Sequence, residues 1–263
     1  MENRPQGPVG EERKVVSIGG LAIDGAPLSY IVILAAVVTA LAFIPFSVII
    51  FAGGSFPLSQ AVLSLIGWVL GPVAGAIASA IGTLVGVIVA PHTARVWIVS
   101  IYGAAMISFA AGTMGAKGKR SGWWIFVAAI SVLSLIGYVG TAILANGAPV
   151  YSVALGAFLD WSAVLLFVLP TRILVARWIG SKNVGKLAAG LFLGIWITYG
   201  IGHVCQSVIY YWIQNWPAEV WLTLAPIIPV EMMVRCLAGT IIGTGVITGM
   251  RKIGLVRPSE AIY

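Results

Sequence analysis

The chain has 263 residues, of which 60% are hydrophobic and 9% are charged, and its mean hydropathy is +1.03. Soluble domains carry about 25% charged residues, so this composition excludes a soluble core with a charged shell. The formal net charge of +7 does not indicate nucleic-acid binding, because the charges flank apolar segments and no basic domain is present. Anionic lipid headgroups at a membrane surface account better for the positive charge.

Residues 1–27 are polar, mixed in charge and without the apolar stretch of a signal peptide, which predicts a cytoplasmic N-terminal tail. A transmembrane helical domain is expected over 28–251, followed by a cytoplasmic tail over 252–263. A spanning helix needs about 20 mostly apolar residues. The segments that meet or approach this requirement are 29–52, 58–70, 72–90, 96–115, 122–145, 151–178, 186–213 and 227–250.

The second segment, 58–70, is short and is separated from the third by Gly71-Pro72. Proline removes an amide donor and disfavours helix in the residue before it, so the two segments are expected to be distinct helices. The fold class is therefore all-α, a polytopic transmembrane bundle of about eight helices. Six or seven helices remain possible if the short segment does not span.

Lys and Arg are distributed in clusters that alternate along the chain with nearly uncharged connections. Cytoplasmic loops retain Lys and Arg, whereas translocated loops lose them. The pattern predicts that both termini are cytoplasmic and that a ligand site lies near the opposite, outer face; only Arg95 breaks it. The clusters are Arg4/Arg13/Lys14, Lys117/Lys119/Arg120, Arg172/Arg177/Lys182/Lys186 and Arg251/Lys252/Arg257.

Small residues recur at intervals of four in several segments, as in Gly190, Gly194, Thr198 and Gly202. Small side chains let helices approach closely in a bilayer, where lipid tails are as apolar as leucine. Two interpretations stay open, namely packing within the chain and contact with a membrane-embedded partner.

Ionisable and polar side chains are costly inside a bilayer, so each one in a predicted helix is a candidate site residue. Asp160 beside Trp161 suits a cationic or hydrogen-bond-donating ligand, while pairing of Asp160 with Arg95 or Arg235 is an equal alternative. An aromatic lining with a few polar groups is typical of small-molecule sites, although an interfacial aromatic belt explains the rings equally well. The remaining candidates, toward the outer ends of the last two segments, are His203, Gln206, Tyr210, Gln214, Asn215 and Glu231.

Two of these candidates have structural alternatives. His203 could be a hydrogen-bonded packing residue, and Glu231 could form an ion pair with Arg235, four residues further along the same helix. No nucleophile elbow, HExxH, Walker A or CxxC motif occurs, and two histidines are too few for most metal sites. We therefore expect no enzyme activity, no metal and no cofactor, and the chain cannot by itself couple transport to ATP.

Several motifs occur together and in order. Ala36 and Ala40 form an AxxxA element in the first segment, and residues 70–82 read LGPVAGAIASAIG. The last segment has Pro229 at its outer start and Arg251 at its inner end. In these features the chain resembles the substrate-binding S component of an energy-coupling factor (ECF) vitamin transporter, over residues 30–116 and the last helix.

This resemblance implies a multi-pass protein of the cell membrane that binds a vitamin-like compound near the outer face. It also implies docking through Ala36 and Ala40 onto a transmembrane coupling subunit that two ATPase subunits drive. The aromatic residues and the carboxylate favour a planar, cationic or amine-bearing heterocycle as the ligand. Two alternatives remain: an ion-coupled secondary transporter with Asp160 and His203 as a proton relay, and an enzyme or structural subunit of a membrane complex.

Overall fold

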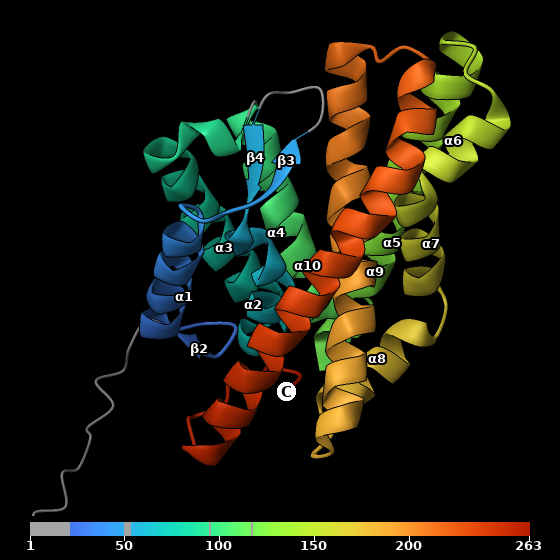
Figure 1. Ribbon diagram of the computed structural model, residues 1–263. Helices are drawn as coiled ribbons and strands as arrows, with labels where there is room; N and C mark the ends of the chain where they lie inside the picture. The colour runs from blue at the N-terminus through green and yellow to red at the C-terminus, as the bar shows by residue number, and fades with distance from the viewer. Residues whose placement is uncertain (1–21, 50–53, 95, 117) are drawn as a thin grey trace, which may run out of the picture.

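A computed structural model describes residues 22–49, 54–94, 96–116 and 118–263 of the protein (Figure 1). These residues form an all-α transmembrane helical bundle, as the sequence predicts. The elements in chain order are β1 Ala22–Ile23, β2 Ala26–Pro27, α1 Leu28–Leu41, β3 Pro45–Ile49, β4 Gly54–Pro57, η1 Leu58–Ala61, α2 Leu63–Leu70, α3 Pro72–Val89, η2 Pro91–Thr93, α4 Trp97–Thr113, η3 Gly118–Arg120, α5 Trp123–Gly140, η4 Thr141–Ala145, α6 Val150–Gly156, α7 Phe158–Val168, α8 Thr171–Ile179, α9 Val184–Gln214 and α10 Glu219–Lys252.

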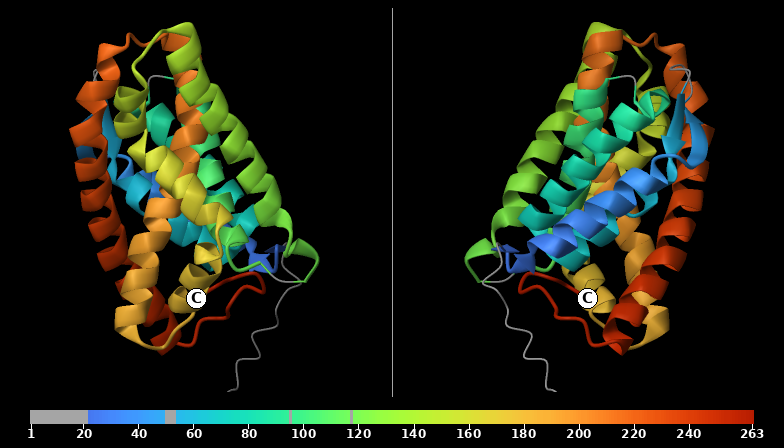
Figure 2. Two further views of the ribbon diagram at one scale, coloured as in Figure 1. Left: turned by 90° about the vertical axis from the view of Figure 1, so that its right-hand side faces the viewer. Right: turned by 90° about the vertical axis from the view of Figure 1, so that its left-hand side faces the viewer.

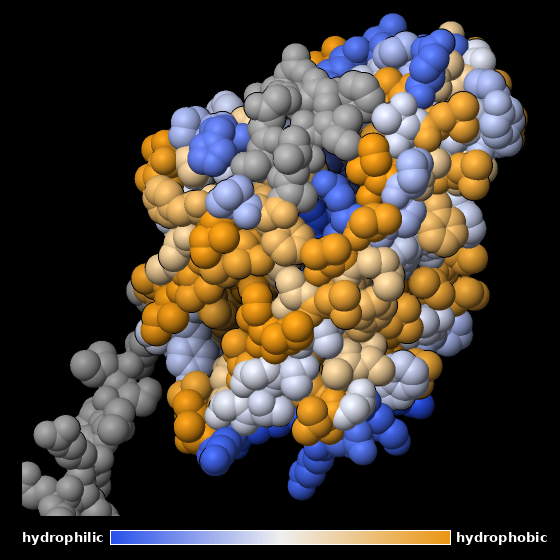
Figure 3. All heavy atoms as spheres, viewed as in Figure 1, coloured by the Kyte–Doolittle hydropathy of each residue, from blue (hydrophilic) through white to orange (hydrophobic). Residues whose placement is uncertain are grey.

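The helices have the length and surface of a membrane-embedded bundle. Four helical stretches among the described residues are long and apolar enough to cross a bilayer: α3, Gly118–Ala145, α9 and α10. The pair α6–α7, bent by 69°, would make a fifth, whereas α1 and α4 are shorter apolar helices. Large apolar side chains such as Leu144 and Ile241 are exposed, and Figure 3 shows an apolar surface with hydrophilic residues at both ends. Such a surface matches lipid acyl chains flanked by headgroups.

The first expected span, 29–52, is wrong in its second half. Helix α1 ends at Leu41, and the chain continues into the antiparallel hairpin β3–β4, whose register pairs Ile49 with Gly54. Proline at position 45 disfavours helical conformation in the residue before it, and it also lacks an amide for the helix. The hairpin carries the chain to η1 and the short α2, and β4 borders η2.

The expected span 151–178 is divided into α6, α7 and α8. The break between α6 and α7 falls at Ala157, beside Gly156, which lies against the backbone of Trp221. The break between α7 and α8 falls at Leu169, whose ψ of 163° is extended because Pro170 follows. Length and hydropathy alone did not reveal these breaks.

Helix α10 is longer than the expected span 227–250. It begins at Glu219 and runs through Pro226 and Pro229 to Lys252, so the expected outer connection 214–226 shrinks to a few residues. Proline inside a helix removes one hydrogen bond, a loss that packed neighbouring helices can compensate in membrane proteins. Helices α9 and α10 pack against each other, with their connection at the top of Figure 1.

The described basic clusters lie at one end of the bundle, which we call the basic end and define by Arg120, Lys182, Arg251 and Lys252. Figures 1 and 2 show η3, the α8–α9 connection and the end of α10 at this end. Arg120 forms an ion pair with Asp24, and Arg251 donates to the carbonyl oxygen of the α8–α9 connection at 2.7 Å. The segregation of charge agrees with the predicted topology.

The C-terminal segment 252–263, expected as a tail, folds back against the basic end. The amide of Ile262 donates to the carbonyl oxygen of Trp68 at 2.9 Å, and Ser259 Oγ donates to the Asp24 carbonyl oxygen at 3.1 Å. Ala261, Ile262 and Tyr263 are buried. The segment therefore seals the ends of α2 and α4 and is part of the packed structure.

Glycines let α2, α3, α4 and α9 pack backbone against backbone. A Cβ atom on Gly67 would lie 2.0 Å from the carbonyl oxygen of Ser108, and one on Gly194 would lie 2.6 Å from the Trp68 ring. Ser108 donates to the Leu63 carbonyl oxygen at 2.6 Å, which ties α4 to α2. For these residues, the small-residue spacing serves packing within the chain.

We expect Gly67→Ala to destabilise the protein by about 1–3 kcal/mol, because the added methyl must push α2 away from α4. Gly249→Ala is the matched control: nothing lies within 4 Å of its Cβ position, and alanine is the better helix former. Thermal unfolding in detergent measures both variants. Equal midpoints would contradict the proposed close contact.

We expect Ile262→Asp to lower the unfolding midpoint, because it places a carboxylate in an apolar contact at the basic end. A Cβ on Gly115 would lie 3.1 Å from the Ile262 side chain, which is 8% exposed. Val256→Asp, in the same segment but 73% exposed, should leave the midpoint unchanged. Faster proteolysis of the C-terminal segment in Ile262→Asp but not in Val256→Asp would show independently that Ile262 holds this segment against the bundle.

Candidate functional site

A cavity of about 140 Å³ opens in the half of the bundle opposite the basic end. Its volume is close to the roughly 150 Å³ cavity that holds one benzene molecule in an engineered protein. Figure 3 shows a hollow on this face, beside α10, with strongly hydrophilic atoms inside it. The lining residues are Phe56, Gln60, Thr93, Ala94, Ser100, Tyr138, Tyr199, His203, Gln206, Ser207, Tyr210, Gln214, Trp216, Leu224, Ile227, Ile228 and Glu231.

Helix α9 contributes most of the polar wall. Tyr199, His203, Gln206, Tyr210 and Gln214 follow one another at intervals of three and four residues, which places them on one face of the helix. All five line the cavity. Four of them are among the predicted site residues, and the structure brings these four to one cavity.

Two contacts position side chains of this wall. The hydroxyl of Tyr199 donates to Gln60 Oε1 at 2.8 Å, which joins α9 to η1. A Cβ on Gly103 would lie 1.3 Å from Gln206 Nε2. The missing side chain at Gly103 therefore makes room on α4 for this amide. The cavity thus has amide groups from two directions and aromatic rings between them.

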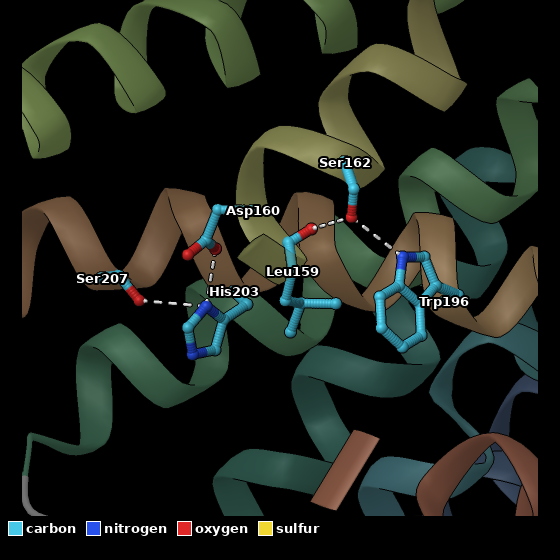
Figure 4. Close-up of polar contacts among 6 residues, drawn as sticks. All are labelled: Leu159, Asp160, Ser162, Trp196, His203 and Ser207. Carbon is cyan, nitrogen blue, oxygen red and sulfur yellow. Dashed lines mark hydrogen bonds and ion pairs between the residues drawn. The ribbon is translucent and has the colours of Figure 1, made fainter. Parts of the chain in front are cut away.

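His203 forms a buried pair with Asp160 (Figure 4). Asp160 Oδ1 lies 2.7 Å from His203 Nδ1, and the aspartate side chain is fully buried in α7. An ionised carboxylate accepts a hydrogen bond from Nδ1–H, which leaves Nε2 as the nitrogen available for a ligand. The neighbouring Ser207 Oγ lies 3.3 Å from the same Nδ1. In a catalytic Ser-His-Asp triad the serine contacts Nε2 instead, so this arrangement does not match one.

The expected pair of Asp160 and Trp161 is divided between two environments. Asp160 lies behind His203 and is absent from the cavity lining, and among the described residues it pairs with His203 and with no Lys or Arg. Trp161 is 38% exposed on the outside of α7, where its Nε1 donates to the Ala154 carbonyl oxygen at 2.9 Å. Adjacent helix residues point in different directions, which separates the two side chains. The expected pairing with Arg95 falls outside the described residues.

Asn215 has a structural position at the end of α9. Its backbone is left-handed, with φ at 43°, and its Oδ1 accepts from Asn146 Nδ2 at 2.9 Å. Asn146 also donates to the Tyr211 hydroxyl at 2.7 Å. Asn215 therefore caps the helix and fixes the α9–α10 connection, and it does not line the cavity.

Glu231 lines the cavity, but its expected ion pair with Arg235 is not formed. Within the described residues no carboxylate oxygen lies within 4 Å of the Arg235 guanidinium. Arg235 is instead 3% exposed, with its Cζ 4.1 Å from the Tyr199 ring centroid and 5.4 Å from that of Phe56. Both rings line the cavity, and Arg235, which is not itself a lining residue, packs against them.

Sequence reasoning missed several polar lining residues, among them Gln60, Tyr199 and Ser207. Tyr199 and Ser207 stand four residues before and after His203, so the helical periodicity of the polar residues could have found them. Gln60 carried no such signal, because it lies in a short 3₁₀ turn, η1, far from α9 in the sequence.

Comparison of the chain with protein-family models, curated proteins and solved structures finds no match. In the part of the chain that the structure describes, no group of three or more His, Cys, Asp or Glu side chains could hold a metal ion. The fold and the cavity together define a membrane protein with a small aromatic- and amide-lined pocket. The groups that face this pocket can stack on a planar ring and form hydrogen bonds with its polar edge.

We expect the Asp160–His203 pair to show coupling in a double-mutant cycle of Asp160→Leu and His203→Leu. Each single change leaves one buried polar partner unpaired, whereas the double change removes both. The double variant should therefore be more stable than the sum of the single effects predicts, by about 0.5–3 kcal/mol. Trp161→Leu serves as a control, because its combination with His203→Leu should be additive. Additive effects for Asp160 and His203 would contradict the pair.

Proposed function

We propose that the protein is the substrate-binding subunit of an ECF-type transporter in the cell membrane and takes up a small heterocyclic, vitamin-like compound. The observation that carries this proposal is the cavity of about 140 Å³, which combines aromatic rings with amide, imidazole and carboxylate groups. Small-molecule sites have this composition. Its volume suits a single ring, and a neighbouring space of about 30 Å³ shares Gln60 and Gln206 with it. In this proposal the ligand is bound and passed on without chemical change.

The exposed face of α1 supports docking onto a partner. Ala36 and Ala40 are both exposed, whereas Ile31, Ala35 and Val38 are buried against the bundle. Two exposed small side chains one helical turn apart offer a flat surface on which a partner helix can pack closely. In the proposed complex this partner is a transmembrane coupling subunit driven by two ATPase subunits. The sequence itself has no Walker A motif, so ATP hydrolysis must come from such subunits.

We expect Ala36→Trp and Ala40→Trp, singly or together, to abolish co-purification of a coupling subunit and two ATPases from the native membrane. The indole would hold the partner helix away, while the cavity lies on other elements and keeps its ligand. Ala129→Trp on α5, another exposed alanine, is the matched control and should leave the complex intact. Mass spectrometry of the tagged protein extracted in mild detergent measures the outcome. Recovery of the wild-type protein without ATPases would contradict the proposal.

A second candidate function, ion-coupled secondary transport, rests on a different observation. The 69° break between α6 and α7 lies close in sequence to the buried Asp160, which pairs with His203. Broken helices and intramembrane ionisable pairs are features of proton-coupled transporters. Uptake by the purified protein in vesicles, driven by a proton gradient without ATP and lost in Asp160→Asn, would favour this function over the first.

A further inference from the structure

Arg235 is a buried cation without a complete set of partners. Its side chain is 3% exposed, and neither Nε nor Nη2 has a hydrogen-bond partner among the described residues. The guanidinium lies against the rings of Tyr199 and Phe56. These contacts satisfy its faces but not its N–H groups. An arginine within a membrane helix is costly, and a buried polar group without an acceptor adds to that cost.

The two unpartnered nitrogens lie on the same edge of the guanidinium group. Nε and Nη2 present parallel N–H bonds, which match the two oxygens of a carboxylate in a bidentate contact. Arg251, near the end of the same helix, shows the contrast, because its Nη1 and Nη2 donate to the carbonyl oxygens of Ser181 and Ile179 at 2.7 Å each. An arginine in this protein thus can be satisfied by backbone groups, and Arg235 is not.

Among the described residues, no carboxylate forms an ion pair with the Arg235 guanidinium. Glu231, one turn earlier on α10, stays more than 4 Å from the guanidinium, and Asp160 is held by His203. Tyr199 and Phe56 both line the cavity and contact the guanidinium, so a molecule in the cavity is a candidate source of acceptors. Nε and Nη2 have no contact with solvent, so a carboxylate would reach them only after side chains between the cavity and Arg235 rearrange.

We propose that the ligand of the cavity is a small aromatic or heterocyclic carboxylic acid whose carboxylate binds the Nε–Nη2 edge of Arg235. This inference rests on the proposed ligand-binding function and narrows its substrate class. The ring occupies the cavity between Tyr199 and Tyr210, and hydrogen-bond donors on the ring face Glu231 and Gln60. An amine-bearing heterocycle fits the same site, provided that it also carries the acid group.

Benzoate and benzamide are suitable probes, because they have the same ring and differ in the charge of one substituent. Their dissociation constants follow from the shift of the unfolding midpoint with concentration in detergent. We expect wild-type protein to bind benzoate at least about tenfold more tightly than benzamide, since an unpaired guanidinium edge rejects a neutral group. Arg235→Gln should bind both equally, and Arg235→Lys should lose most of the preference because it lacks the fork. Arg251→Gln is the matched control and should keep the wild-type ratio.

Each outcome decides the inference. Absence of saturable benzoate binding, equal binding of the two probes by wild-type protein, or an unchanged ratio in Arg235→Gln overturns it. If Arg235→Gln does not fold, the wild-type ratio and Arg235→Lys still decide. The function itself fails separately: a benzoate preference without co-purifying ATPases keeps the acid site but not the ECF assignment. Co-purifying ATPases with no benzoate preference would support the ECF assignment and overturn the acid site.

Discussion

Backbone contact between helices, permitted by glycine, is the constraint on which the rest of this structure depends. Gly67 lies against the backbone of α4, Gly75 against Gly67 itself, and Gly112 against Pro72 at the start of α3. Gly194 brings α9 to the Trp68 ring in the same way. In a bilayer, helix association relies on such close packing, because burying apolar side chains away from lipid gains little. The position of α9 in this packed unit sets one side of the cavity, which α10, η1 and η2 help to enclose.

Several polar groups of the interior are paired with one another across helices. Ser64 and Thr198 lie 2.7 Å apart, and Asp160 and His203 have the same separation between their bonded atoms. These contacts fix the rotation of α9 relative to α2 and α7, which turns its polar face toward the cavity. Some buried polar atoms of the described residues have no hydrogen-bond partner, and Nε and Nη2 of Arg235, behind the cavity rings of Tyr199 and Phe56, are two of them. Burying an unpaired guanidinium in a membrane protein is costly, and such residues are commonly functional. Pairing with a ligand carboxylate would offset this cost.

The fold class and much of the cavity wall could be predicted from the sequence. Apolar segment length predicted a helical bundle, and the polar residues of α9 identified His203, Gln206, Tyr210 and Gln214. The effect of proline was harder to predict. Hydropathy predicted a helix through Pro45, but α1 ends before this residue, whereas Pro226 and Pro229 lie inside α10. The difference is tertiary, because a hairpin partner is available after α1 and packed neighbours support α10. Proline identity alone does not distinguish these cases.

The sequence by itself determined that this is a membrane-embedded helical protein with its described basic clusters at one end, since these properties depend on local composition. Only the tertiary structure decided which polar groups meet. Asp160 and His203 are 43 residues apart and belong to different helices, and Trp161, next to Asp160 in sequence, points away from the cavity. Arg235 faces Tyr199 and not Glu231 on its own helix. Such pairings depend on how each helix is rotated and shifted against its neighbours, and interhelical packing sets that rotation.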